Sequence, residues 1–178
     1  MPSTRVLRRR LCRDPVLDLV VDPYAPAARA WVPALRELTL RVDVPVEVVC
    51  TGDRAGQEDS LHAAAGIIAL LAPEAVHPVT VVEDVLRAHA DRGQDIADLG
   101  VVAELAAARR LDTDAVKLMA ASDHALAMAR EDREIARRLG DPGDVALLHH
   151  GGGGRWRRLP GPPATGRELV AAWGALTR

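Results

Sequence analysis

The sequence predicts an α/β fold in which a small β-sheet is split along the chain by a block of helices. Two short apolar runs rich in β-branched residues, 16–21 (VLDLVV) and 44–50 (VPVEVVC), are typical of buried strands. A strand-like pattern returns at 145–149, after a stretch of helical character from 57 to 139. The chain has 178 residues, which fits one domain with a sizeable core.

The first strand, 16–21, is expected to lead directly into a helix. The Asp-Pro pair at 22–23 stops the strand, and Pro26 suits the first turn of the helix that follows. Apolar residues recur there at helical spacing, namely Ala27, Ala30, Trp31, Ala34, Leu35 and Leu38. Pro33 is expected to kink or restart this helix. The strand at 44–50 then lies parallel to the first, because a right-handed crossover joins them.

The middle of the chain, 57–139, is predicted to form four or five helices. Helix-breaking residues divide it at Pro73, Pro78, Gly93, Gly100 and the turn from Asp112 to Asp114. Two of the helices have candidate N-caps, which are Asp112 or Thr113 for the first and Ser122 or Asp123 for the second. The second of these is a long amphipathic helix that ends before Gly140.

The end of the chain returns to strands and closes with a helix. The strand at 145–149 is followed by a glycine turn at 151–154, and 155–159 can return as its hairpin partner. A final helix is predicted over 165–176. This order of elements is that of a thioredoxin fold with a helical insertion. The predicted boundaries are 14–178 for a single domain, 14–56 and 140–178 for its thioredoxin core, 57–139 for the insertion, and 1–13 for an N-terminal extension.

The charge pattern argues against two classes of partner. The formal net charge is -2 and charges of both signs are interspersed, so no nucleic-acid-binding surface is expected. The basic run from Arg8 to Arg10 is interpreted as a solvated extension, with an anion or RNA contact as the alternative. No apolar stretch approaches the roughly 18 residues of a membrane span, and the N-terminus does not match a signal peptide. The expected location is the cytoplasm.

The cysteines and histidines predict no metal or cofactor site. Cys12 and Cys50 lie far apart and form neither a CxxC nor a zinc-ligand pattern, so two reduced thiols are expected. A disulfide between them is the alternative, which a cytoplasmic location disfavours. His149 and His150 point to opposite faces of a strand, which argues against a joint metal site. Any of the six histidines could serve as a general acid or base, and none is singled out.

Three segments resemble the DsbA-like family of thioredoxin-fold proteins. The segment 22–35 (DPYAPAARAWVPAL) is similar to that family's D-P-x-C-x-x-C motif at the start of a helix. The segment 87–114 (RAHADRGQDIADLGVVAELAAARRLDTD) resembles the family's helical insertion. The segment 133–148 (REIARRLGDPGDVALL) resembles its A-x-x-x-G-V-x-G-x-P-T-L motif. The resemblance covers Val16 to the C-terminus and extends to FrnE-like proteins, 2-hydroxychromene-2-carboxylate isomerases and kappa-class glutathione transferases.

The resemblance implies that the redox machinery of the family has been lost. Ala25 and Ala28 stand at the two cysteine positions, so this chain lacks both the attacking and the resolving thiol there. Val145 stands at the cis-proline position. The isomerase and transferase branch holds a glutathione thiol with a serine at the first cysteine position, and Ala25 lacks that donor too. Cys50 as a relocated nucleophile is the least favoured hypothesis, because a buried structural thiol is more common.

Two functional hypotheses remain. The first is a redox-inactive DsbA-like protein that binds a small molecule in the former active-site cleft and acts, without a cofactor, as a biosynthetic isomerase, cyclase or dehydratase. The second is a non-catalytic scaffold for a partner protein. A homodimer is left open, and no catalytic residue is assigned. The residues expected to contact a ligand are Tyr24, Ala25, Pro26, Ala28, Arg29, Trp31, Asp144 and Val145.

Overall fold

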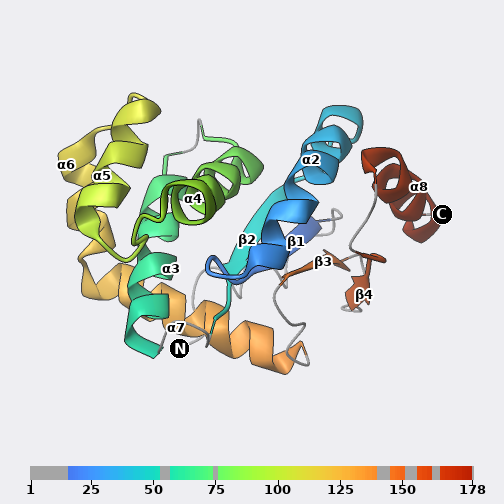
Figure 1. Cartoon of the computed structure of the whole chain (residues 1–178). Helices are drawn as coiled ribbons and strands as arrows, with labels where there is room; N and C mark the ends of the chain where they lie inside the picture. Colours follow the sequence, from blue (N-terminus) through green and yellow to red (C-terminus); the bar gives the residue numbers. More distant parts are fainter. Residues whose placement is uncertain are drawn as a thin grey trace.

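A four-stranded sheet flanked by helices forms the described part of the chain (Figure 1). The computed structural model describes residues 16–52, 57–73, 76–139, 145–150, 156–161 and 165–177. The strands are β1 (Val16–Val21), β2 (Val46–Cys50), β3 (Val145–His150) and β4 (Trp156–Arg158). The helices are α2 (Pro26–Arg41), α3 (Gln57–Leu71), α4 (Pro78–Arg92), α5 (Leu99–Ala108), α6 (Thr113–Ala120), α7 (Asp123–Arg138) and α8 (Gly166–Leu176). The predicted order, with five helices between the two strand pairs, is confirmed.

The sheet has the strand order β2-β1-β3-β4. β1 runs parallel to β2 and antiparallel to β3, and β3 is antiparallel to β4. Val21, the last residue of β1, pairs with Cys50 on one side and with Val145 on the other. The C-terminal ends of β1 and β2 and the start of β3 therefore lie at the same end of the sheet, and α2 begins beside that end.

Helices cover both faces of the sheet. Strand residues alternate between the faces, so Leu17 and Leu19 join a core with α2 and α8, whereas Val20 packs with Ala136 of α7 on the other side. Figure 1 shows α7 crossing the sheet on the side opposite α2 and α8. Among the described helices, none combines the length and apolar content needed to span a bilayer.

Helix α2 continues through Pro33, so the predicted restart of the helix is wrong, and the predicted kink stays a prediction. An internal proline removes one backbone hydrogen bond and costs about 3 kcal/mol or more. The residues around it supply the compensation, because Trp31, Leu35 and Leu38 of the same helix are buried in the core. Pro33 itself is exposed to solvent.

The predicted N-caps are confirmed for two helices. The Asp112 carboxylate accepts hydrogen bonds from the amides of Asp114 and Ala115 at the start of α6. The Ser122 hydroxyl accepts one from the amide of Ala125 at the start of α7. The N-terminal extension with Cys12 and Arg8 to Arg10, the glycine turn at 151–154 and the Gly140 boundary lie outside the described residues.

Candidate functional site

The turn between β1 and α2 is organised by the buried side chain of Asp22. Its carboxylate oxygen Oδ1 accepts a hydrogen bond of 2.9 Å from the amide of Tyr24, and its carbonyl accepts one of 3.0 Å from the amide of Ala25. An aspartate that bonds the amide two residues on favours a tight turn. The Asp-Pro-Tyr sequence therefore places Tyr24 at the edge of the sheet, directly before the helix.

A buried polar layer supports this turn from below. Gly52 has a φ of 145°, and a Cβ there would lie 3.0 Å from Oδ1 of Asp22, so only glycine fits without strain. The guanidinium of Arg133 donates a 2.9 Å hydrogen bond to the carbonyl of Gly52. The buried carboxylate of Asp132 accepts a 3.2 Å hydrogen bond from the amide of Cys50. Helix α7 thus holds the end of β2 in position beside the turn.

Tyr24, His89 and Asp95 meet at the end of α4, and we refer to them as the Tyr24 cluster. The Tyr24 hydroxyl donates a 3.3 Å hydrogen bond to Oδ1 of Asp95, 71 positions away in the sequence. The Tyr24 ring packs edge-on against His89, with ring centroids 5.0 Å apart and an interplanar angle of 82°. Asp95 is held in turn by the amide of Ala97 at 3.0 Å. The cluster therefore joins the predicted core to the predicted insertion.

The environment of Tyr24 keeps its hydroxyl protonated. Burial raises the pKa of the phenol well above its ordinary value, and the negative charge of Asp95 and its hydrogen bond raise this pKa further. The carboxylates of Asp59 and Asp22 act in the same direction. At neutral pH the phenol is consequently a hydrogen-bond donor and carries no charge.

His89 is oriented by the backbone of the loop after α4. Its Nδ1 lies 3.3 Å from the carbonyl oxygen of Gln94. A carbonyl can only accept, so this contact assigns the proton of the neutral imidazole to Nδ1. The other ring nitrogen, Nε2, is then the one with a lone pair, which is the state that a general base needs.

An ion pair makes a second connection between α2 and α4. Arg29 in the first turns of α2 pairs with Asp91 near the end of α4. More than half of the Arg29 side chain and about a third of that of Asp91 are exposed, so the pair adds little stability. It orients the Arg29 guanidinium towards the end of α4.

The N-terminus of α2 offers backbone donors without a competing side chain. Its N-cap, Ala25, has no side-chain acceptor, Pro26 occupies the first helical position, and the first turn contains no acidic residue. The positive end of the helix dipole is therefore not neutralised within α2. Ala25 and Ala28 are each only 2% exposed, and the amide of Ala28 donates to the carbonyl of Ala25, so the exposed residue Ala27 is the one in the first turn whose amide a ligand could meet.

The predicted ligand-contact residues fall into three groups. Tyr24 and Arg29 contact Asp95 and Asp91, at the end of α4 and in the loop after it. Trp31 is 3% exposed, and its indole lies against Gly161 in the core. Val145 is buried as the first residue of β3, where it pairs with Val21. The side chain of Pro26 and all of Asp144 are outside the described residues.

Sequence analysis did not identify three residues of this site. His89, Asp91 and Asp95 come from the segment 87–114, which resembles the family's helical insertion and from which no ligand-contact residue was predicted. A chemical signal was present there, because aspartates and a histidine cluster within seven positions around a glycine. Within the described residues, no group of His, Cys, Asp and Glu side chains is arranged to hold a metal ion.

The ionisation of Tyr24 provides a direct test of the cluster. Tyr24 is the only tyrosine of the chain, so the phenolate absorbance of the folded protein reports on it alone. We expect a titration midpoint well above the ordinary pKa of about 10. Because the unfolded chain loses this proton first, the free energy of unfolding should be unaffected below pH 10 and fall above it, by roughly 1.4 kcal/mol for each pH unit up to the folded-state pKa.

Two variants separate the causes of this shift. Asp95→Asn should lower the phenol pKa towards its ordinary value, because it removes the nearest charge. Asp59→Asn should lower it less, since Asp59 has a smaller effect. A native midpoint near 10, or equal effects of the two substitutions, would contradict the geometry of the Tyr24 cluster.

Comparison with known proteins places the fold. Sequence comparison finds no matching protein family and no matching curated protein. Among solved structures, a candidate protein disulfide isomerase from Nitrosomonas europaea is similar with a TM-score of 0.79 and 14% identity, over 92% of this chain and 98% of the other. The cytosolic disulfide reductase DsbM from Pseudomonas aeruginosa is similar with a TM-score of 0.72 and 17% identity, over 91% and 97%.

A third similar structure extends the likeness to the DsbA proteins themselves. Reduced DsbA1 from Neisseria meningitidis matches with a TM-score of 0.73 and 12% identity, over 99% of this chain and 87% of the other. At such low identity these likenesses establish the fold alone. The chain has a DsbA-like thioredoxin fold, as its sequence predicts.

Proposed function

We propose that this chain is a DsbA-like protein without thiol redox chemistry, and that it binds a small organic molecule between the Tyr24 cluster and the N-terminus of α2. The observation that carries the proposal is the meeting of Tyr24, His89 and Asp95 beside a helix end that lacks cysteine. In this fold that helix end is the place where the redox-active members carry their thiols. In this chain, the polar side chains of the Tyr24 cluster, which can transfer a proton, lie beside that helix end.

The absence of redox chemistry follows from the residues at the helix end. Ala25 and Ala28 provide no sulfur, so neither attack on a disulfide nor resolution of a mixed disulfide is available there. Cys50 is only 2% exposed and lies at the end of β2, not at a helix N-terminus. It therefore lacks the helix dipole that favours a thiolate at the cysteine position of the redox-active members.

The Tyr24 cluster supplies the two halves of a proton transfer. His89 Nε2 can accept a proton from a carbon or oxygen of the ligand, and the protonated phenol of Tyr24 can donate a hydrogen bond to the ligand's oxygen in place of Asp95. The amides and dipole of α2 favour the negative charge that develops on that oxygen. The protonated His89 then returns the proton, to a second ligand atom in an isomerisation, to the new alkoxide in a cyclisation and to the departing hydroxide in a dehydration, so none of these reactions needs an electron acceptor.

The proposed ligands are aromatic hydroxy acids and β-diketones of the polyketide type. The resemblance from Val16 to the C-terminus supports this class, because it extends to FrnE-like proteins and 2-hydroxychromene-2-carboxylate isomerases. The solved DsbM structures include one with GSH, but this chain has no side-chain donor at Ala25 to hold a glutathione thiol. We therefore propose that glutathione is not required. The likeness to cytosolic DsbM supports a cytoplasmic location for the reaction.

Calorimetric titration against a panel of these compounds, headed by 2-hydroxychromene-2-carboxylate with and without glutathione, tests the proposal. At least one compound should bind with micromolar affinity. Tyr24→Phe and His89→Gln should each weaken this binding about tenfold, which corresponds to about 1.4 kcal/mol. His124→Gln is the matched control, because His124 is exposed on α7 away from the cluster, and it should leave binding unchanged.

The opposite result would favour the scaffold hypothesis. If no compound of the panel binds, and a partner protein instead protects the Tyr24 cluster from hydrogen exchange, the fold serves as an interaction module. The described surface gives the scaffold hypothesis less support. Its exposed large apolar residues, Leu40 and Leu118, lie on separate helices, α2 and α6, and do not form one apolar patch.

A further inference from the structure

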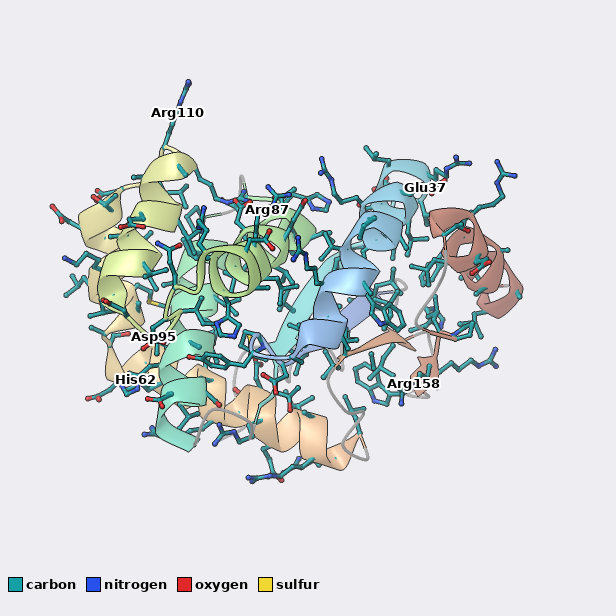
Figure 2. All side chains as sticks on the ribbon, viewed as in Figure 1. Glu37, His62, Arg87, Asp95, Arg110 and Arg158 are labelled. Atoms are coloured by element: carbon teal, nitrogen blue, oxygen red, sulfur yellow. The ribbon has the colours of Figure 1, made fainter. Side chains whose placement is uncertain are left out.

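A charged hollow lies along α4, beyond the Tyr24 cluster. It has a volume of about 640 Å³ and is bounded by α2, α4 and the end of α5. Volumes of this order are typical of sites for small molecules. The charged residues that line it are Arg36, Glu83, Asp84, Arg87 and Arg109. Figure 2 labels Arg87 on α4, one of the residues that line the hollow.

One wall of the hollow is fixed by Arg109 at the end of α5. Its guanidinium donates to the carboxylate of Asp84 at 2.6 Å and to the hydroxyl of Thr80 at 3.1 Å. The side chain is only 18% exposed, so these bonds are sheltered from water. The charges of Arg109 and Asp84 therefore neutralise each other, and the two side chains form a rigid wall of the hollow.

The other wall carries two arginines that share one carboxylate. Nη2 of Arg87 lies 2.5 Å from Oε1 of Glu83, and Nη1 of Arg36 lies 3.3 Å from Oε2 of the same side chain. Arg36 comes from α2 and Arg87 from α4, so the two cations approach Glu83 from different helices. A single negative charge cannot neutralise both. The lining therefore holds three arginines against two carboxylates, an excess of one positive charge.

A second hollow of about 220 Å³ continues from the first. The two share Glu83 and Arg87, and the second also reaches Arg29 of the candidate site. More than half of the Arg36 and Arg87 side chains is exposed, so both guanidinium groups can turn towards a ligand without unfolding a helix. Arginine is suited to phosphate because its planar fork can donate two parallel hydrogen bonds.

We infer that the α2–α4 hollow is a phosphate-binding site, in which Arg36 and Arg87 hold the phosphate group of a small molecule in competition with Glu83. The site is separate from the Tyr24 cluster and does not depend on the function proposed for it. The hollow is larger than a phosphate ion, which favours a phosphate ester over the free ion as its occupant.

Calorimetric titration of the full chain with pyrophosphate tests this site, at neutral pH in about 0.1 M sodium chloride, where non-specific charge effects are partly screened. Binding with a dissociation constant below about 1 mM is expected. Arg36→Gln and Arg87→Gln should each weaken it about fivefold or more, because each removes one charged donor pair. Glu83→Gln should tighten it about threefold, because the competing carboxylate is gone.

Two control variants test whether the change in binding is specific to the hollow. Arg110→Gln removes a neighbouring arginine that projects away from the hollow (Figure 2) and should leave binding unchanged. Tyr24→Phe should also leave it unchanged, so failure of the phosphate site and failure of the proposed function are distinguishable.

Titration with ribose 5-phosphate and with inorganic phosphate distinguishes a phosphate ester from the free ion as the ligand, and tighter binding of the ester is expected. Equal weakening by Arg110→Gln and Arg87→Gln, no tightening by Glu83→Gln, or no measurable binding would each overturn the inference.

Discussion

Replacing Ala25 and Ala28 by cysteine together is expected to introduce insulin reductase activity with clear turnover. Ala25 is the N-cap of α2, and the amide of Ala28 donates a 3.1 Å hydrogen bond to its carbonyl, so the two positions are adjacent on the first turn. A thiol at such a helix end has a lowered pKa and is largely ionised at neutral pH, which makes it a good nucleophile. Turbidity of insulin with dithiothreitol measures the gain, and mass spectrometry of the oxidised variant measures the new disulfide.

The control for this gain is a cysteine pair with the same spacing on the same helix. Ala27 and Ala30 are exposed residues of α2 that lie further from its N-cap, and cysteines there should give little activity. Equal activity of the two pairs would contradict the alignment of Ala25 and Ala28 with the two cysteine positions of the family. Robust activity of the native chain, abolished by Cys50→Ser, would contradict the proposed loss of redox chemistry.

Gly161→Ala is expected to destabilise the protein strongly. A Cβ at this position would lie 1.9 Å from Cζ2 and 2.0 Å from Cη2 of Trp31, much closer than any real contact. Because the indole is buried between α2 and its neighbours, it cannot move aside without disturbing the core. Such overpacking costs about 1–3 kcal/mol or more. For a chain of this size the midpoint of thermal unfolding should fall by roughly 2–12 °C, which calorimetry or circular dichroism can measure.

Gly174→Ala provides the matched control for this clash. Gly174 lies inside α8, and a Cβ there would meet no atom within 4 Å. Alanine is the better helix former, so this variant should be neutral or more stable by up to about 1 kcal/mol. A loss of stability of similar size in both variants would show that Trp31 does not pack against Gly161 as described.

The sequence predicted the order of elements well because each helix and strand has a local sequence signal. The β-branched runs, the proline at the start of α2 and the Asp112 and Ser122 caps are all signals that act within a few residues. The Tyr24 cluster could not be found in this way. Its hydrogen bond joins positions 71 residues apart, and no local pattern states which loop of an insertion will meet the first turn.

Trp31 illustrates a different limit of sequence analysis. Helical spacing places it on the same apolar face as Leu35 and Leu38, but spacing does not tell whether that face meets a ligand or the core. In the structure the question is decided by the segment around Gly161, which comes 130 positions later and brings its backbone against the indole ring. Here again a distant segment determines the environment.

The short strand β4 has a consequence for the behaviour of the protein at high concentration. It ends the sheet, and an unprotected edge strand can recruit the edge of another molecule and start aggregation. β4 has only three residues, and two of them, Arg157 and Arg158, are exposed and positively charged. An identical edge approaching it would bring like charges together and find few backbone partners. Self-association of this chain by continuation of the sheet through β4 is therefore disfavoured.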